Sequence, residues 1–395
     1  MSGRIVLATV TLSHVSQHFY VGLSVLYPEI MTELGLNYTQ LGLMTGTSSM
    51  ISGFAQMIWS LLVRYMPRRI LLGVGNILVS AGCFIMGSAR SFIEMVGGNV
   101  VSGSGQAAQH PVGTSILAHK FSREKVGEAL SIHYGLGYIG NIISPILLSL
   151  IAVSYGWRLA VYGLAIIPLA SGLTVLYFLR GDRLAPGQGQ DKETRSLLKD
   201  LKSAARVRNG FIVIAAEAFA IGGSGMGVIT TYTPVYLKNF LMVGVFETSM
   251  IYAFAVVGGV VGTILFGRLA RKYGNLKMAA LITGLSSALI LLLRSYSAFS
   301  ILIIPHLFVI GATSFGGSSL LQAYLVSVST PSERDILIGL YFTIGFGCSS
   351  VWTTFTGFVI DAYGSFDPAW LLRAALGTVA FTLMIWALKR AKWHA

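Results

Sequence analysis

The chain of 395 residues is 54% hydrophobic and only 11% charged, and it carries a formal net charge of +13. Because an ordinary soluble domain carries roughly 25% charged residues, this composition excludes a typical soluble protein and indicates a surface that largely faces lipid. Apolar runs of about 20 residues, the length that crosses a bilayer, recur along the whole chain and leave no room for a sizeable soluble domain.

The first apolar run, from about Ile5 to Ile30, predicts a retained membrane helix. It is too long for a secretory signal peptide, only Arg4 precedes it, and no small-residue cleavage site follows it. Further apolar runs predict spans over residues 38–63, 70–89, 92–117, 127–153, 158–179, 209–236, 246–268, 275–294, 297–326, 335–361 and 368–388. We therefore expect an all-α membrane protein with twelve transmembrane helices.

The basic residues alternate between the two sides of these spans. With the N-terminus placed inside, the inner segments hold every lysine and arginine except Arg90, Arg158, Lys238, Arg294 and Arg373. By the positive-inside rule, this asymmetry predicts cytoplasmic N- and C-termini in an inner or plasma membrane. The positive charge then needs no nucleic-acid partner, and the expected partner is the lipid bilayer.

Residues 180–208 form the one extended polar stretch, with six predicted spans before it and six after it. Its segment LLKDLKSAARV predicts a short amphipathic helix on the inner membrane surface. The two halves also repeat each other weakly: GLGYIG (135–140) in the fifth span is echoed by GFGCSS (345–350) in the eleventh. We therefore expect two six-helix bundles, residues 1–179 and 209–395, joined by a cytoplasmic linker.

Two basic turns, SLLVRYMPRR (60–69) and GRLARKYGNLK (267–277), occupy equivalent places in the two halves. They resemble the loop motif of the major facilitators, G-x-L-A-D-R-x-G-R-[KR], which implies the fold built from parallel six-helix repeats. Arginines stand near the place of the motif's aspartate in both halves. The candidate gating residues are Arg64, Arg68, Arg69, Gly267, Arg271, Lys272 and Asp361.

Several further segments resemble the fosmidomycin-resistance branch of that family. They are LSH (12–14), LYP (26–28), QHP (109–111), GEALSIHYGLGYIGNIISP (127–145), ITTYTPVYL (229–237) and IGLYFTIGFG (338–347). The resemblance implies a proton-driven exporter of drugs, and Asp361 matches an aspartate of the branch. Two carboxylates of the branch are absent, because His18 replaces an aspartate and Val112 replaces the glutamate of its HPE motif.

Ionisable residues inside a membrane are costly and are functional candidates by default. In the implied fold, spans 1, 4, 7 and 10 line the central cavity, and most such residues of this chain fall on those spans. The candidate substrate and proton pathway consists of His14, His18, Gln106, His110, His133, Glu217, Tyr232 and His306.

His14 and His18 lie on one helical face, because residues four apart are neighbours on a helix. Imidazole titrates near neutral pH, so the pair is expected to share a proton or to bind a substrate anion. Two alternatives stay open: neutral rings that bond a neighbouring helix, and a metal site completed by His110, His306 or Glu217. Glu217 is the only carboxylate near the middle of a span, and it is either a coupling group or a protonated structural residue.

The GLGYIG run satisfies a dinucleotide-binding pattern, but it lies inside a span without a preceding strand, so we interpret its glycines as sites of close helix contact. Pro145 ends a stretch that resembles the fifth-span motif of antiporters, with Ser144 in place of its glycine. No phosphate-binding GxxxxGK[ST] motif occurs, so no nucleotide or other cofactor is expected.

The sequence therefore predicts a monomeric secondary transporter that exports a small organic compound, for which an anion is one candidate, in exchange for protons. Three alternatives stay open: symport of a sugar or organic acid, a metal-binding intramembrane enzyme, and a non-transporting sensor.

Overall fold

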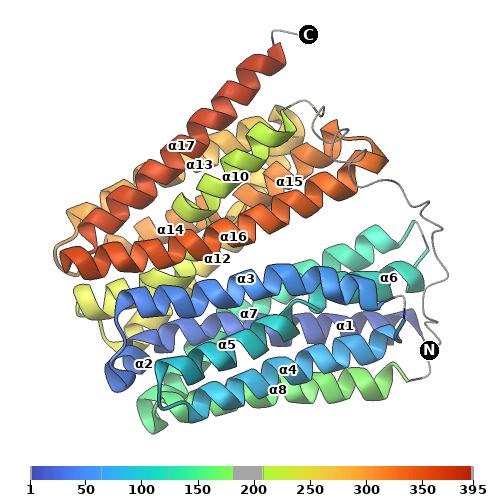
Figure 1. Ribbon diagram of the computed structural model, residues 1–395, viewed down its shortest axis with the longest axis horizontal. Coiled ribbons are helices and arrows are strands. Elements are labelled where there is room, and N and C mark those ends of the chain that lie inside the picture. Colours follow the sequence, from blue (N-terminus) through green and yellow to red (C-terminus); the bar gives the residue numbers. More distant parts are fainter. Residues whose placement is uncertain (1, 64, 123, 181–206, 208, 393–395) are drawn as a thin grey trace. The chain divides into compact units, whose positions relative to one another are not determined.

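The computed structural model describes residues 2–63, 65–122, 124–180, 207 and 209–392, and all regular structure in these residues is helical (Figure 1). They form two compact units. The first unit takes the described residues of Met1–Leu36, Leu43–Gln190 and Val245–Ala253, and the second takes those of Asn37–Gly42, Asp191–Gly244 and Phe254–Ala395. The predicted linker helix falls almost wholly on residues 181–206 and 208, outside the described part, so the division at 180–208 remains a proposal.

Helices occupy all twelve predicted spans. In the N-terminal half they are α1 (Gly3–His18), the 3-10 helix η1 (Phe19–Leu26), α2 (Tyr27–Leu34), α3 (Tyr38–Leu62), α4 (Arg68–Ser88), α5 (Phe92–Gln106), the π-helix η2 (Gln109–Gly113), α6 (Thr114–Lys120), α7 (Val126–Tyr155) and α8 (Trp157–Phe178).

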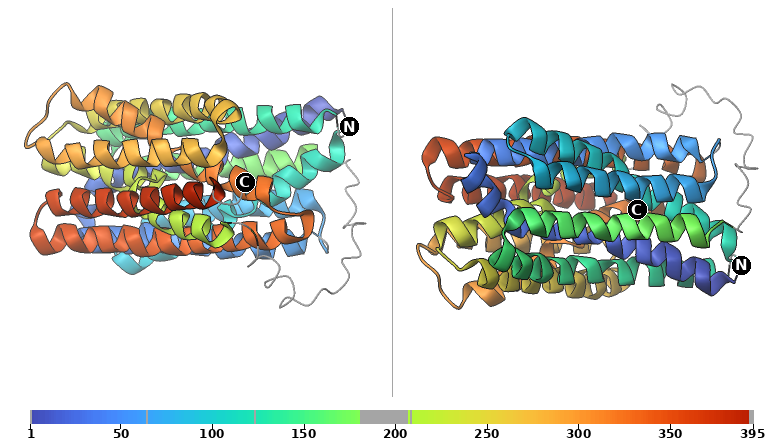
Figure 2. Two further views of the ribbon diagram at one scale, coloured as in Figure 1. Left: turned by 90° about the horizontal axis from the view of Figure 1, so that it is seen from above. Right: turned by 90° about the horizontal axis from the view of Figure 1, so that it is seen from below.

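In the C-terminal half the helices are α10 (Gly210–Gly223), the π-helix η3 (Val228–Tyr232), α11 (Thr233–Val235), the π-helix η4 (Tyr236–Phe240), α12 (Val245–Tyr273), α13 (Asn275–Leu292), the 3-10 helix η5 (Leu293–Ser295), α14 (Ile303–Ser314), α15 (Gly317–Val328), α16 (Pro331–Tyr363) and α17 (Asp367–Lys392). Within each unit the long helices run lengthwise beside one another (Figures 1 and 2).

Four of the predicted spans are interrupted, which the apolar runs did not show. The first changes to a 3-10 helix after His18, and the fourth contains a π-helix around Pro111. The seventh breaks after Gly223 and contains Pro234, and the tenth breaks between α14 and α15. Proline removes a backbone donor and disturbs the helical hydrogen bonds, so the local chemistry explains the π-helix around Pro111 and the π-helices that flank Pro234.

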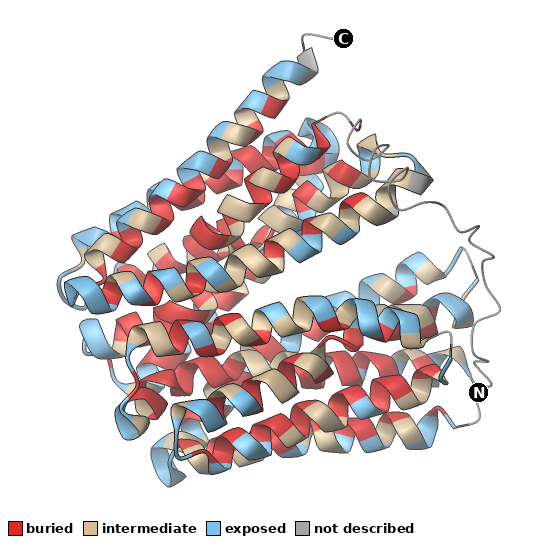
Figure 3. Cartoon of the chain, in the orientation of Figure 1, coloured by how far each residue is buried: buried red, intermediate tan, exposed pale blue. Residues whose placement is uncertain are grey.

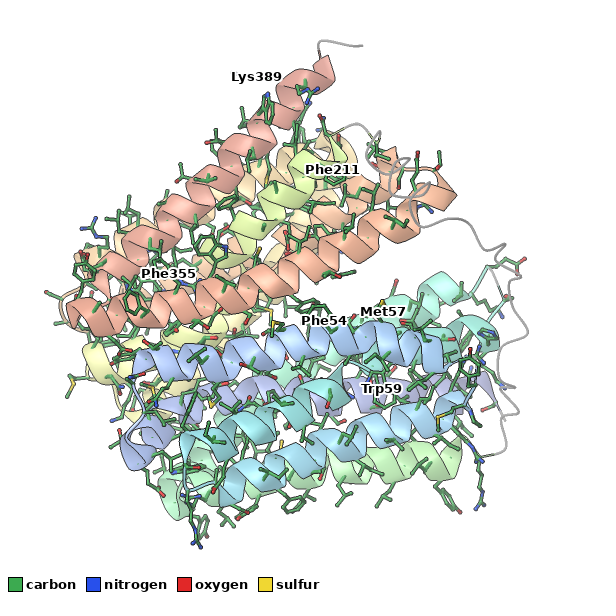
Figure 4. The ribbon with its side chains drawn as sticks, in the orientation of Figure 1. Phe54, Met57, Trp59, Phe211, Phe355 and Lys389 are labelled. Carbon is green, nitrogen blue, oxygen red and sulfur yellow. The ribbon has the colours of Figure 1, made fainter. Side chains whose placement is uncertain are left out.

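The outer sides of the helices expose apolar residues. Eight helices among the described residues are long and apolar enough to cross a membrane. Exposed residues recur along the length of α8 (Figure 3). Among them Leu159, Ile166 and Leu173 are seven residues apart and therefore share one helical face. On α3, Phe54 and Met57 project from one side while the buried Trp59 projects from the other and donates to the Ser104 carbonyl (Figure 4).

Candidate functional site

Four predicted histidines gather in the first unit. The ring centre of His14 lies 4.5 Å from that of His18, 5.4 Å from that of His110 and 4.4 Å from that of His133. His14 is 2% exposed and His133 is 0% exposed, whereas His18 is half-buried and His110 is exposed. The fold thus brings together histidines from α1, η2 and α7.

Glycines on α7 allow the close approach of α1. A β-carbon on Gly137 would lie 2.5 Å from Nδ1 of His14, and one on Gly140 would lie 2.8 Å from Cβ of His18. The interpretation of these two GLGYIG glycines as sites of close helix contact is therefore confirmed. It is wrong for Gly135, because a β-carbon there would meet nothing within 4 Å.

The two histidines of α1 belong to a continuous hydrogen-bonded chain. Nδ1 of His14 lies 3.1 Å from the carbonyl oxygen of His133, and Nε2 of His14 lies 3.0 Å from Nε2 of His18. Nδ1 of His18 then lies 2.7 Å from Oδ1 of Asn141. The chain starts and ends on α7 and crosses both imidazole rings, so it can hold or move a proton along its length.

Two tyrosines of α7, which the sequence reasoning missed, enclose the histidines. The Tyr134 ring stacks on His110 at 5.9 Å and its hydroxyl lies 2.8 Å from that of Thr114, while the Tyr138 ring lies 5.5 Å from His18. Tyr134 directly follows His133, and Tyr138 lies one helical turn after Tyr134. This spacing was the signal by which the sequence could have indicated both residues.

Buried polar atoms without a partner lie on the same two helices, α1 and α7. They include both ring nitrogens of His133, Nδ2 of Asn141, Oγ of Ser144 and Nε2 of Gln17. Buried polar groups are normally hydrogen-bonded, so this region has spare donors and acceptors for a polar guest. Among the described residues, no group of three or more His, Cys, Asp or Glu side chains is placed so that it could hold a metal ion.

Glu217 occupies a separate site in the second unit. Its carboxyl group is buried on α10, with the residue 2% exposed, and Oε1 accepts a 2.6 Å hydrogen bond from Ser318. The Tyr341 hydroxyl donates to the Ser318 carbonyl at 2.7 Å, and Oε2 of Glu217 has no partner. One oxygen of this buried carboxyl is therefore held and the other is available.

His306 and the other candidates of the pathway lie elsewhere. His306 contacts the Leu289 carbonyl at 2.9 Å and the Tyr296 hydroxyl at 3.3 Å, so both ring nitrogens serve local packing in the second unit. Gln106 is half-buried at the end of α5. Tyr232 is fully buried and donates to the Thr353 carbonyl at 2.7 Å.

Arg373 is a buried cation that the sequence analysis noted only as an exception to the charge asymmetry. The residue is 1% exposed on α17, and its guanidinium donates to the Gly222 carbonyl at 2.8 Å. The same group lies 5.7 Å from the centre of the Tyr232 ring. Arg373 thereby satisfies a carbonyl in the last turn of α10, where the seventh span breaks.

The predicted gating residues are distributed among different contacts. Arg68 is buried, donates to the Ser115 hydroxyl at 2.7 Å and lies 3.1 Å from Nε2 of His119; Arg69 follows it in the first turn of α4. Gly267 lies on α12, and the exposed Arg271 and Lys272 lie in its last turn. Arg64 lies outside the described residues.

Asp361 caps the beginning of α3. Its carboxylate accepts hydrogen bonds from the backbone N–H groups of Tyr38 and Thr39 at 3.0 and 2.7 Å. The first N–H groups of a helix have no partner within the helix, and a negative charge there is favourable. The end of the eleventh span is thereby fixed to the start of the second.

We expect Asp361→Ala to lower the thermal unfolding midpoint of the protein, because loss of a capping side chain costs about 0.5–2 kcal/mol. Amide hydrogen exchange at Tyr38 and Thr39 should accelerate in the same variant. Asp367→Ala is the matched control for hydrogen exchange, since it removes a carboxylate from an exposed ion pair with Arg294 and leaves the N–H groups of Tyr38 and Thr39 bonded to Asp361. Unchanged exchange at Tyr38 and Thr39 would contradict the capping role.

Comparison with known proteins adds a family and a fold. Residues 10–353 match the family model described as Major Facilitator Superfamily. The chain is 27% identical over 379 residues to the uncharacterized MFS-type transporter YfnC of Bacillus subtilis, with 94% of this chain and 90% of the relative covered. It is 24% identical over 369 residues to the fosmidomycin resistance protein of Escherichia coli, with 90% and 86% covered.

A solved structure of a mutant of the nucleoside transporter NupG superposes on the chain with a TM-score of 0.81 at 14% identity, covering 97% of this chain and 99% of the other. At that identity the match concerns the fold alone. It confirms the predicted all-helical membrane architecture.

Proposed function

Because the chain belongs to the Major Facilitator Superfamily, it is a membrane-embedded secondary transporter and not an enzyme, and we propose that it carries a small organic anion together with protons. In such folds the two halves rock around a site between them to give alternating access. The proposal includes a monomer in the inner or plasma membrane with both termini cytoplasmic, in keeping with the distribution of lysine and arginine.

The four-histidine cluster carries the proposal. Among the ring and hydrogen-bond contacts of His14 and His18 in the described residues there is no carboxylate, lysine or arginine. A protonated imidazole there has no counter-ion from its own surroundings, so an anionic substrate would supply one. Charge-assisted hydrogen bonds to a carboxylate or phosphonate are stronger than neutral ones, which makes anion binding and proton binding cooperative.

The cluster favours symport as the mode of coupling, because a proton and an anion that stabilise each other bind together. The predicted export by proton antiport is the second candidate. It is supported by the similarity to the fosmidomycin resistance protein and by the Pro145 stretch that resembles the motif of antiporters. Drug efflux and resistance belong to this second candidate.

The direction of a pH change separates the two modes. Sealed proteoliposomes with an internal pH dye would be challenged from outside with phosphonates, organic acids and hydrophobic drugs. With symport, entry of an anion acidifies the interior, whereas antiport makes it alkaline. We expect acidification, and we expect His18→Ala to reduce it to the level of empty liposomes.

His306→Ala is the matched control, because His306 bonds Leu289 and Tyr296 in the second unit, outside the cluster. Full anion-dependent acidification in His18→Ala would contradict the proposal. If a labelled compound crosses the membrane without a pH change, transport is either uniport or is coupled to another ion.

A further inference from the structure

We propose that the His14–His18 pair holds one exchangeable proton and that Asn141, by turning its side-chain amide, is the positioning residue that lets the pair accept or release it. This inference deepens the proposed function, on whose proton coupling it rests. It follows from which atoms of the hydrogen-bonded chain are able to donate.

One end of the chain is fixed by the backbone. The carbonyl oxygen of His133 only accepts hydrogen bonds, and Nδ1 of His14 lies 3.1 Å from it. Nδ1 of His14 must therefore carry a hydrogen whenever this contact is a hydrogen bond. In a neutral imidazole the other nitrogen is then bare, so Nε2 of His14 is an acceptor in the uncharged pair.

The neutral pair thereby requires one tautomer of His18. Its Nε2 lies 3.0 Å from the bare Nε2 of His14, so the Nε2–H of His18 must donate. The Nδ1 of neutral His18 is then an acceptor. Within the described part of the chain its one hydrogen-bond partner is the Asn141 amide at 2.7 Å, which must then present its NH₂ group.

The protonated pair requires the opposite amide orientation. With one added proton, both Nδ1 atoms carry hydrogens and the third proton lies between the two Nε2 atoms. Asn141 then presents its oxygen to His18, which is the orientation in the structure, and its Nδ2 has no partner among the described residues. Since no other side chain holds that NH₂ group, turning the amide breaks no second hydrogen bond.

A second added proton is excluded by the geometry. Both Nε2 atoms would then carry hydrogens across a separation of 3.0 Å, and two like charges at this distance oppose each other strongly. The pair therefore titrates as one unit with a single proton, which matches the single charge of a monoanionic substrate.

No carboxylate, lysine or arginine is among the ring and hydrogen-bond contacts of the pair in the described residues. The titratable groups that face the pair are His110 from η2 and His133, Tyr134 and Tyr138 from α7. The side chains of these four residues take no part in the hydrogen-bonded chain, which His133 joins only by its backbone carbonyl. The part of α4 that reaches α1 contributes the neutral Asn76, which bonds Ser13 and Ser16.

The first test reads the protons directly, without transport. The full-length protein, labelled with ¹⁵N-histidine and placed in lipid nanodiscs, would be titrated by NMR, with signals assigned by single histidine substitutions. We expect His14 as the Nδ1–H tautomer and His18 as the Nε2–H tautomer at high pH, and joint uptake of one proton at lower pH. The Nδ1–H tautomer of His18 at high pH, two protons taken up, or none, would overturn the inference.

The second test uses Asn141→Asp, whose ionised carboxylate can only accept. It should keep the pair protonated to a higher pH, moving the midpoint of the titration upward by about 1–3 pH units. Asn99→Asp is the matched control, since Asn99 is an equally buried asparagine of the first unit that bonds Tyr20 rather than a histidine. Equal shifts in the two variants would show a general charge effect and overturn the role of Asn141.

Should Asn141→Asp not fold, the NMR titration of the unaltered protein still decides the inference. If NMR gives the expected tautomers and uptake of one proton, but proteoliposomes show no anion-dependent proton movement, the inference is supported and the proposed function is overturned. If proteoliposomes show that movement, but NMR gives another tautomer of His18 or another number of protons, the inference is overturned and the proposed function stands.

Discussion

Gly137→Ala is expected to reduce anion-dependent proton movement by about 100-fold, while the protein still assembles in the membrane. The added β-carbon would lie 2.5 Å from Nδ1 and 2.7 Å from Cε1 of His14, so the ring has to leave the carbonyl oxygen of His133. Displacing a functional group by about 1 Å is sufficient for losses of this size at reactive sites. The measurement is the rate of the internal pH change in proteoliposomes that contain equal amounts of protein.

Gly135→Ala provides the matched control for this variant. Gly135 lies on the same helix two residues earlier, and a β-carbon there would meet nothing within 4 Å. Alanine is also favoured over glycine within a helix by about 0.5–1 kcal/mol, so this variant should keep full activity and unfold no earlier. Equal activity of the two variants would show that the contact between His14 and α7 is irrelevant to transport.

The same pair of glycines shows how far the sequence predicts the site. The run GLGYIG indicates close helix contact, but its spacing does not identify the partner helix. The contact of Gly137 with His14, and the freedom of Gly135, depend on the rotation of α7 against α1, which only tertiary packing determines. Hydropathy likewise located all twelve spans, because apolar length is a property of the chain alone.

The spacing of the histidines also predicted one contact correctly and failed to predict another. His14 and His18 were predicted to share one face from their spacing, and the structure brings them together. The placing of His306 on a cavity-lining span suggested a shared site, yet its ring bonds Leu289 and Tyr296 in the second unit. A span number indicates which helix a residue occupies, but it does not indicate the depth or direction of its side chain.

The partner that stabilises the break after Gly223, Arg373, was beyond sequence reasoning for a different reason. A break is tolerated inside a membrane when other groups satisfy the backbone atoms that it releases. The guanidinium of Arg373 reaches the Gly222 carbonyl from a residue 151 positions away in the sequence. Such a long-range partner leaves no local pattern, so the stabilisation of the break is not visible in the seventh span itself.

Glu217→Gln is expected to abolish the accumulation of anion driven by a pH gradient while leaving the fold intact. The substitution keeps the shape of the side chain and an oxygen that accepts the Ser318 hydrogen bond, which is 2.6 Å long in the structure, but it removes the only ionisable group near the middle of the seventh span. Coupling free energies between binding sites are about 1–3 kcal/mol, or roughly 5- to 150-fold in affinity, so we expect the unaltered protein to accumulate anion within that range and the variant to lose this accumulation.

Two assays on one preparation separate this role from a structural one. If Glu217 carries a proton, Glu217→Gln should still exchange labelled anion for unlabelled anion at equal pH, because exchange needs no net proton movement, yet it should no longer respond to a pH gradient. Glu94→Gln is the control, since the exposed Glu94 caps the Arg90 N–H at the start of α5. Gradient-driven accumulation that survives in Glu217→Gln would assign Glu217 to helix packing through Ser318, and proton coupling would then rest on the histidine cluster alone.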